Sequence, residues 1–330
     1  MDPLLRTVLA RLSGAQLRLD GPSPLVTTEE AVSLAELPVR DTLDLITLGG
    51  TVRAALSPSF FNCGIVNAKS GRCPENCAFC AQSAHYRTDT PVYPFVSTDV
   101  LVERAAHAKA CGDLRFGIVT SGTALDERDA DRLCRAVERI VREVGINVCG
   151  SLGILTPERA RRYAEAGMTR YHHNLETARS FFPRICSTHA YEEDLESLHA
   201  ARTAGMQVCS GGILGLGESL AQRVELAFTL AEANVDSIPV NLLNAIPGTP
   251  LEAMPKLSPQ EALRSIALFR IVNPLRDILI AGGRGHVLGT WQSWLYAAGA
   301  NGMMTGDYLT TAGAEADFDA GLMRTLGVRD

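Results

Sequence analysis

The chain has 330 residues and a formal net charge of −6, and 46% of its residues are hydrophobic while 21% are charged. This composition is ordinary for a soluble globular protein and excludes a disordered chain, and the negative charge argues against nucleic-acid binding. No run of about 18 apolar residues is present, which excludes a membrane-spanning helix. The nine cysteines favour metal binding or catalysis in a reducing cytoplasm over a disulfide framework.

Residues 1–58 are expected to form an N-terminal extension of helices and turns. Its first segment carries Arg6, Arg11 and Arg18 among apolar residues. This pattern is typical of an amphipathic helix rather than of a signal peptide.

From residue 59 onward, apolar runs typical of strands alternate with charged runs of helical period. Expected strands are 61–67, 114–120, 146–152, 169–174, 206–213, 236–242, 276–281 and 301–305. Expected helices are 98–111, 126–143, 157–166, 191–204, 219–233, 258–271 and 290–299. Several of these helices begin after a capping residue (Ser97, Thr156, Ser258) or end at a glycine (Gly112, Gly145, Gly167, Gly205).

Eight strands that alternate with helices predict parallel pairing, because each connection is a right-handed crossover. The count favours a closed (β/α)8 TIM barrel over residues 59–330, with a C-terminal tail, and leaves an open doubly wound sheet as the alternative. In such barrels the reactive groups lie at the carboxyl ends of the strands.

The strongest motif is a C-x3-C-x2-C run formed by Cys73, Cys77 and Cys80 just after the first expected strand. Soft thiolates select iron–sulfur clusters or zinc. Three ligands without an obvious fourth leave one iron of a cluster open to a small molecule. The alternative is a zinc knuckle that takes His85 as its fourth ligand.

This cysteine run, with Phe79 before its last cysteine, resembles the radical S-adenosylmethionine (SAM) enzymes. Further segments are similar to the biotin synthase family in order and spacing, and the likeness covers about residues 60–315. The segments are NAKSGRCPENCAFCAQSAHY (67–86), YHHNLET (171–177), VCSGGILGLGE (208–218), IPVNLL (238–243), IPGTPL (246–251) and AGGR (281–284).

The resemblance implies that Cys73, Cys77 and Cys80 hold a [4Fe–4S] cluster whose open iron is chelated by SAM. An electron from an external donor then yields a 5′-deoxyadenosyl radical, which removes hydrogen from dethiobiotin. A second, auxiliary iron–sulfur cluster inside the barrel donates the sulfur that completes biotin. The cofactors supply this chemistry, and the protein orients them. A homodimer is also a family expectation.

The family usually holds the auxiliary [2Fe–2S] cluster with three strand cysteines and one strand arginine. Cys149 and Cys209 match two of these cysteines, which makes them the candidate catalytic residues of sulfur transfer. Gly117 and Leu279 stand where the third cysteine and the arginine are expected. The usual cluster therefore cannot be built here.

Two other cysteines are candidates for the missing positions. Cys63 lies on the first expected strand, and Cys186 follows the fourth. We expect Cys63, Cys149, Cys186 and Cys209 to ligate a different auxiliary cluster, a four-iron one with an additional sulfide. The alternative is that such cysteines pack as small buried side chains, which is how we interpret Cys111 and Cys134.

The remaining candidates follow from the resemblance. For SAM binding they are Phe79, Asn174, Glu176, Gly211, Gly212 and Ile213, and for dethiobiotin they are His172, Asn174, Asn241 and Arg284. His172, Asn174 and Glu176 alternate and so share one strand face. The family usually has asparagine at His172 and aspartate at Glu176.

Each of these candidates has a structural alternative. The glycines are common in tight βα turns, and Asn241 is a side chain that could hydrogen-bond loop backbone. Arg284 could bind a carboxylate with two hydrogen bonds or brace the barrel.

Two further functions remain open at this stage. One is a radical SAM enzyme of the same barrel subfamily, a maturase or mutase, that inserts no sulfur. The other is a non-enzymatic iron–sulfur or zinc protein, which the YHHNLET and SGGILGLGE segments argue against.

Overall fold

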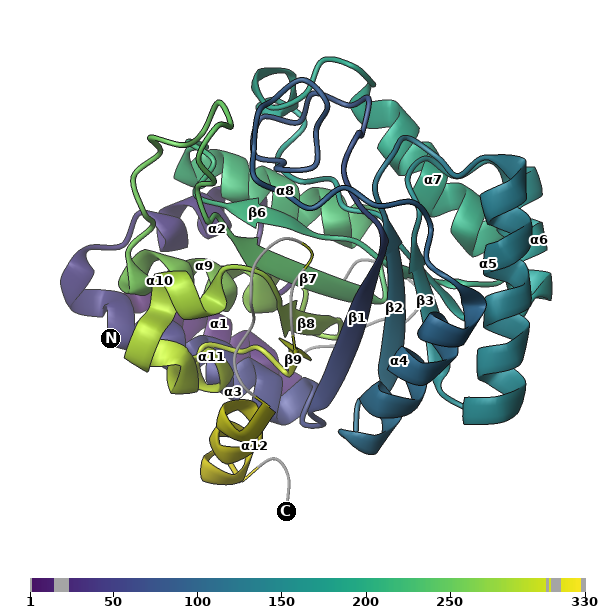
Figure 1. The fold of residues 1–330 in the computed structure, drawn as a ribbon. Helices are drawn as coiled ribbons and strands as arrows, with labels where there is room; N and C mark the ends of the chain where they lie inside the picture. Colours follow the sequence, from purple (N-terminus) through teal and green to yellow (C-terminus); the bar gives the residue numbers. More distant parts are fainter. Residues whose placement is uncertain (1, 15–23, 307–308, 310–315, 328–330) are drawn as a thin grey trace.

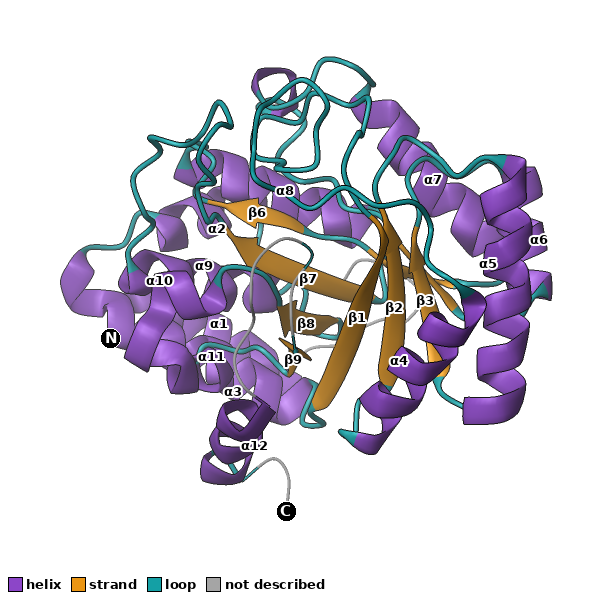
Figure 2. Cartoon of the chain, viewed as in Figure 1, coloured by secondary structure: helices purple, strands orange, loops and turns teal. Residues whose placement is uncertain are grey.

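The computed structural model describes residues 2–14, 24–306, 309 and 316–327. A single parallel sheet lies at the centre of the molecule (Figure 1; Figure 2). Its strands are β1 (Phe61–Lys69), β2 (Arg115–Thr120), β3 (Asn147–Ser151), β4 (Arg170–His172), β5 (Gln207–Cys209), β6 (Gly212–Leu214), β7 (Ser237–Leu242), β8 (Asp277–Ile280) and β9 (Gly302–Thr305).

The sheet closes into a barrel. Its order is β5-β4-β3-β2-β1-β9-β8-β7-β6, and β5 also pairs with β7. The strands β5 and β6 are two halves of the strand expected over 206–213, so the ring has eight members. The (β/α)8 barrel is confirmed, and the open-sheet alternative is wrong.

A proline on the neighbouring strand explains the interruption between β5 and β6. Cys209 pairs with Ser237 and Gly212 pairs with Val240, so Pro239 on β7 lies beside the break. Because proline has no N–H, it cannot donate to the ladder at that point. The chain turns at Ser210 and Gly211 and then resumes pairing.

The helices between the strands begin and end near their expected positions. They are α4 (Thr98–Ala110), α5 (Glu127–Arg139) with a π-turn (Ile140–Val144), α6 (Pro157–Glu165), α7 (Tyr191–Thr203), α8 (Leu220–Glu232) and α9 (Pro259–Val272). The expected caps form, since the hydroxyls of Ser97, Thr156 and Ser258 accept backbone N–H groups. All four helix-ending glycines have positive φ: Gly112, Gly145, Gly167 and Gly205.

The region after β8 differs from expectation. Instead of one helix over 290–299, the structure has α10 (Arg284–Leu288), a 3₁₀ turn (Gly289–Ser293) and α11 (Trp294–Ala297). Gly289 has a φ of 51°, which is incompatible with a continuous right-handed helix and breaks it.

The N-terminal extension forms α1 (Pro3–Gly14), α2 (Thr28–Ala35), a 3₁₀ turn (Val39–Asp41) and α3 (Thr42–Leu56). Helix α2 contacts α8 and α9, and α3 contacts α9 and α11. Residues of these helices belong to the same hydrophobic core as the barrel, for example Leu5, Leu34 and Leu45. The expected amphipathic helix is present as α1, and Arg18 lies outside the described residues.

The C-terminal tail contains a helix that the pattern did not predict, α12 (Ala316–Thr325). Its Asp319 forms an ion pair with Arg284, and the Met323 sulfur accepts a hydrogen bond from Asn62 at 3.1 Å. Among the described residues, no helix has the length and apolar character needed to cross a membrane.

Candidate active site

The loop after β1 carries the C-x3-C-x2-C run at the carboxyl end of the barrel. Cys73 is tied into this loop by its backbone, which donates to Gln82 at 2.9 Å and accepts from Ala84 at 2.7 Å. Cys73, Cys77 and Cys80 are all half-buried, and Cys80 faces the barrel cavity together with Phe79. The loop thus presents thiols beside the mouth of the cavity.

The thiols of Cys73, Cys77 and Cys80 are not gathered into a site for a single zinc ion. Four ligands at zinc bonding distance require sulfur atoms within about 4 Å of one another. In the described part of the chain, the one group of potential ligands gathered within 4.8 Å is Glu75, Cys186 and His189, so the Cys73, Cys77 and Cys80 sulfurs are spread more widely. The expected fourth zinc ligand, His85, instead contacts the Pro74 carbonyl oxygen at 2.8 Å.

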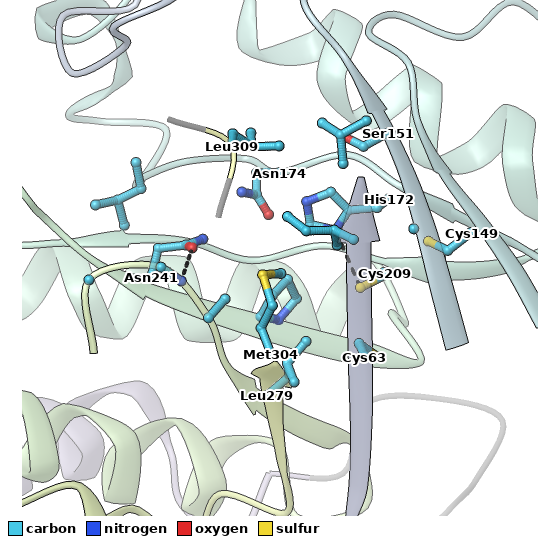
Figure 3. A pocket seen from close by; sticks show the side chains of 18 of the residues that line it. Cys63, Cys149, Ser151, His172, Asn174, Cys209, Asn241, Leu279, Met304 and Leu309 are labelled. Carbon is cyan, nitrogen blue, oxygen red and sulfur yellow. Dashed lines mark hydrogen bonds between the residues drawn. The ribbon is translucent and has the colours of Figure 1, made fainter. Parts of the chain in front are cut away.

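A second set of cysteines lies deeper, inside the barrel. Cys63 on β1, Cys149 on β3 and Cys209 on β5 line the same cavity as Cys80 (Figure 3). They are absent from the gathered group above, so their sulfurs are also too widely spaced for a single ion. Three of the four expected auxiliary ligands therefore line one cavity.

The structure places Cys186 apart from this set. Its sulfur lies 3.8 Å from the Cys77 sulfur, on the side of the cysteine loop, and it is not among the residues that line the cavity. The cause is the path of the chain, because the segment after β4 runs outward to meet the loop after β1. There Cys186 also contacts His189 and Asn76, each at 3.4 Å.

Burial and nearby charges give the cavity cysteines different proton affinities. Burial raises the pKa of Cys63 to about 12 and also raises that of Cys149. Burial acts in the same direction on Cys209, but His172 and Arg170 outweigh it and lower the pKa of Cys209. The His172 Nδ1 atom lies 3.3 Å from that sulfur. Cys209 is therefore the thiol in this set that loses its proton most readily.

Two arginines accompany these cysteines, and the sequence interpretation missed both. Arg115 is the first residue of β2 and Arg170 the first of β4, and both line the cavity. A signal was present, because Arg170 precedes His172 by two residues and so shares its face. An arginine at an inward barrel position is unusual enough to mark a site.

The candidate SAM residues lie between the cysteine loop and the cavity. Phe79, Asn174 and Ile213 line the cavity, whereas Glu176 lies beyond the end of β4 with a φ of 59°. Its carboxylate accepts a hydrogen bond from the Asn174 amide at 3.3 Å. Burial raises the pKa of Glu176 to about 7.

The glycines at the β5–β6 break serve the backbone packing of the barrel. A Cβ atom on Gly211 would lie 1.9 Å from the Pro239 carbonyl oxygen, and one on Gly212 would lie 2.4 Å from the Glu176 carbonyl oxygen. Only glycine fits such contacts. These residues bring β4, β6 and β7 together and thereby position Asn174, whose oxygen accepts from the Gly211 N–H at 3.2 Å.

The candidate substrate residues do not all lie at the cavity. His172, Asn174 and Asn241 line the cavity (Figure 3). Asn241 also holds backbone, since its oxygen accepts from the Gly282 N–H at 2.9 Å.

Arg284 does not reach the cavity. It is 1% exposed, its guanidinium donates to Asp319 and to Gln292 at 2.5 Å each, and it is not among the lining residues. These contacts match the bracing alternative and place the guanidinium away from the cavity.

Two family models match the chain. One is the radical SAM superfamily, over residues 68–230, and the other is the Biotin and Thiamin Synthesis associated domain, over residues 239–329. A biotin synthase of Nitratidesulfovibrio vulgaris (strain DP4) is 55% identical over 92% of this chain and 84% of that protein. A biotin synthase of Geotalea uraniireducens is 48% identical over 92% of this chain and 93% of that protein.

Solved structures of lower identity share the fold. Methylornithine synthase has a TM-score of 0.79 at 18% identity, covering 98% of this chain and 95% of its own. HydG, a maturase of the [FeFe]-hydrogenase, has a TM-score of 0.77 at 16% identity, covering 98% of this chain and 74% of its own. At these identities the likeness concerns the barrel architecture alone.

Proposed function

The chain belongs to the biotin synthase family of radical SAM enzymes, and from that premise we propose that it converts dethiobiotin into biotin by inserting a sulfur atom. The observation that carries the proposal is the presence of two cysteine sets on one cavity. Cys80 of the loop set and Cys63, Cys149 and Cys209 of the deep set all line it. A substrate between them is within reach of both a radical source and a sulfur source.

Cys73, Cys77 and Cys80 would hold the [4Fe–4S] cluster. When bound, this cluster and SAM supply the radical that removes hydrogen from unactivated carbon, and an auxiliary cluster supplies sulfur. The protein's part is to orient and to exclude water. Glu176, with Asn174 beside it, would accept the ribose hydroxyls of SAM, and Phe79 and Ile213 would cover the ligand from the apolar side.

Cys63, Cys149 and Cys209 would hold the auxiliary cluster. Their convergence on one cavity supports an auxiliary cluster, and the absence of two usual [2Fe–2S] ligands, at Gly117 and Leu279, favours a four-iron cluster with an additional sulfide. His172 contacts Cys209 directly, so its part would lie at the boundary between auxiliary cluster and substrate. Asn241 would face the ureido group of dethiobiotin.

The proposal includes an external electron donor, because reductive SAM cleavage consumes an electron. We infer a cytoplasmic location from the cysteine content, because a C-x3-C-x2-C metal-binding run suits a reducing compartment. A homodimer is carried over from the family.

The test is anaerobic incubation of the reduced, reconstituted protein with SAM, with and without dethiobiotin. Release of 5′-deoxyadenosine and formation of biotin are expected. Release of 5′-deoxyadenosine without biotin would instead favour a radical SAM enzyme that inserts no sulfur, and the absence of both products would contradict the proposal. Cys73→Ala should abolish both products.

A further inference from the structure

Arg170 is a buried cation that the proposed function leaves without a role. It is 3% exposed, and in the strand register it pairs with Cys149 on β3. Nη1 donates to the Ser237 hydroxyl and Nη2 to the Gln207 side-chain oxygen at 2.6 Å. Both partners are neutral. They fix the plane of the guanidinium but do not compensate its charge.

Arg170 forms no ion pair with a carboxylate among the described residues, and the charged groups that act on it are the cavity cysteines and, more weakly, Asp277. No carboxylate oxygen there lies within the 4.0 Å of an ion pair, and the Nε–H has no hydrogen-bond acceptor. An arginine does not lose its proton in proteins, so it carries this charge into the barrel. A buried charge without a counterion is strongly unfavourable, which indicates that an anion belongs beside it.

Arg115 lies on the neighbouring side of the cavity and differs from Arg170 in having a carboxylate partner. Its Nη2 lies 3.5 Å from an Asp277 carboxylate oxygen, and its guanidinium lies over the Phe61 ring at 4.6 Å. Its buried Nη1 has no acceptor in the part of the chain that the structure describes. Two arginines that line one cavity therefore each keep a buried N–H donor without an acceptor among the described residues.

The position of these donors identifies the anion they face. Both arginines are the first residues of their strands, so they lie deep in the barrel, level with the cysteines and away from Phe79 and Ile213 at the mouth. Burial opposes the charge of Arg170, and the nearby groups that favour it are Cys209, Cys149 and Cys63 and, after these, Asp277. A cluster of thiolates and inorganic sulfide is the anion that this depth and these neighbours fit.

We propose that Arg170, assisted by Arg115, holds the auxiliary cluster by donating N–H bonds to its sulfur atoms and balancing its negative charge. This inference rests on the proposed function. In this chain the cation comes from β4, while Leu279 occupies the β8 position where the resemblance expects an arginine. Arg170 is thus a positioning residue that permits a cluster with only three cysteine ligands.

The experiment compares wild type with Arg170→Met and Arg170→Lys after anaerobic reconstitution with iron and sulfide. Iron and sulfide per chain and the Mössbauer spectrum are measured. Arg170→Met should retain about half the wild-type iron, in the form of the radical SAM cluster, if both clusters contain four irons. Arg170→Lys keeps the charge without the forked donors, so it should retain more iron with an altered auxiliary spectrum.

Melting temperature without clusters separates this role from a purely structural one. Because Arg170→Met removes an uncompensated charge, the cluster-free variant should melt above cluster-free wild type, whereas reconstitution should raise its melting temperature less. A variant that melts below wild type when both are cluster-free would indicate a structural brace and would overturn the inference.

The controls distinguish the two possible failures. Wild-type protein that takes up iron for only the radical SAM cluster contradicts the proposed function. Wild type with both clusters and an Arg170→Met variant with the same iron, sulfide and spectrum overturns only the role of Arg170. A variant that keeps both clusters but binds dethiobiotin more weakly would show that Arg170 binds the substrate carboxylate. That result would also overturn the proposed role of Arg170. If Arg170→Met does not fold, the test relies on Arg170→Lys. A Mössbauer spectrum of the auxiliary cluster that is the same in Arg170→Lys as in wild type would then overturn the role of Arg170.

Discussion

The cysteines of this chain fall into separate groups because of where their side chains lie. Cys63 is separated from Cys149 by more than eighty residues, yet both line one cavity. Cys186 belongs to the loop following β4 and contacts Cys77 instead. Sequence spacing could identify Cys73, Cys77 and Cys80 because their loop is local. It could not place Cys186, whose position depends on where a long connection docks.

A pair of substitutions tests this division. Cys149→Ala should lower iron per chain and abolish biotin formation while 5′-deoxyadenosine is still released, because the loop cysteines are untouched. Cys186→Ala should keep the auxiliary iron, since its sulfur does not face the cavity. Iron analysis after reconstitution checks both. Equal losses in the two variants would put Cys186 back among the auxiliary ligands.

The carboxylate of Glu176 should make SAM binding dependent on pH. Burial raises its pKa to about 7, and the ionised form is the better acceptor for two ribose hydroxyls. SAM affinity should therefore be full above about pH 8 and fall as the pH drops through about 7. Glu176→Gln should weaken SAM binding about tenfold or more at the higher pH and remove this dependence.

A stability measurement provides the control for Glu176. Its pKa in the folded protein lies above the ordinary value of 4.5, so the ionised form opposes folding above about pH 7 and the protonated form does not. Cluster-free Glu176→Gln should therefore be more stable than wild type at about pH 8, and this advantage should disappear toward pH 4.5. If Glu176→Gln were more stable than wild type by the same amount at every pH, the raised pKa of Glu176 would be contradicted.

At the scale of the elements, the alternation of strands and helices was predictable because hydrophobic residues recur with a different period in each. Helix ends were predictable because capping depends on residues that are close in the sequence. The examples are the capping hydroxyls of Ser97, Thr156 and Ser258 and the glycines that end helices. The break between β5 and β6 was not predictable, because its cause is Pro239 on another strand. The inward position of Arg170 follows from the alternation of side chains along a strand, because Arg170 and His172 are two residues apart and share one face.

The β5–β6 break should tolerate no side chain at Gly211. A Cβ there would lie 1.9 Å from the Pro239 carbonyl oxygen, which is backbone and cannot move aside. Gly211→Ala should lower the free energy of unfolding by about 3 kcal/mol or more. Gly285→Ala in α10 is the matched control, since nothing lies within 4 Å and alanine favours a helix by up to about 1 kcal/mol. Denaturant unfolding would show whether the two variants differ in this way.

For the molecule as a whole, helices at both ends of the chain secure the barrel. The N-terminal helices share the barrel's core, and α12 is attached through the buried Arg284–Asp319 ion pair, whose side chains are 1% and 2% exposed. Arg284 was expected at the substrate, and its partner could not be foreseen because Asp319 lies in a tail whose helix the pattern did not indicate. The ion pair thus attaches the C-terminal helix α12 to the barrel.

Breaking this ion pair should affect the whole molecule rather than substrate recognition. Asp319→Asn leaves a buried arginine without its anion and should cost about 3–5 kcal/mol of stability. The double variant Arg284→Met/Asp319→Leu removes both charges and should cost less than Asp319→Asn alone. Thermal unfolding measures this order. Dethiobiotin affinity lost in Arg284→Met at unchanged stability would contradict the bracing role.

The central claim is that the deep cysteines hold the sulfur that enters the product. Protein reconstituted with isotopically labelled sulfide is freed of excess sulfide, reduced, and allowed a single turnover with SAM and dethiobiotin. Labelled biotin is expected from wild type, and Cys209→Ala should release 5′-deoxyadenosine without any biotin. Unlabelled biotin from wild type, or labelled biotin from Cys209→Ala, would contradict the account.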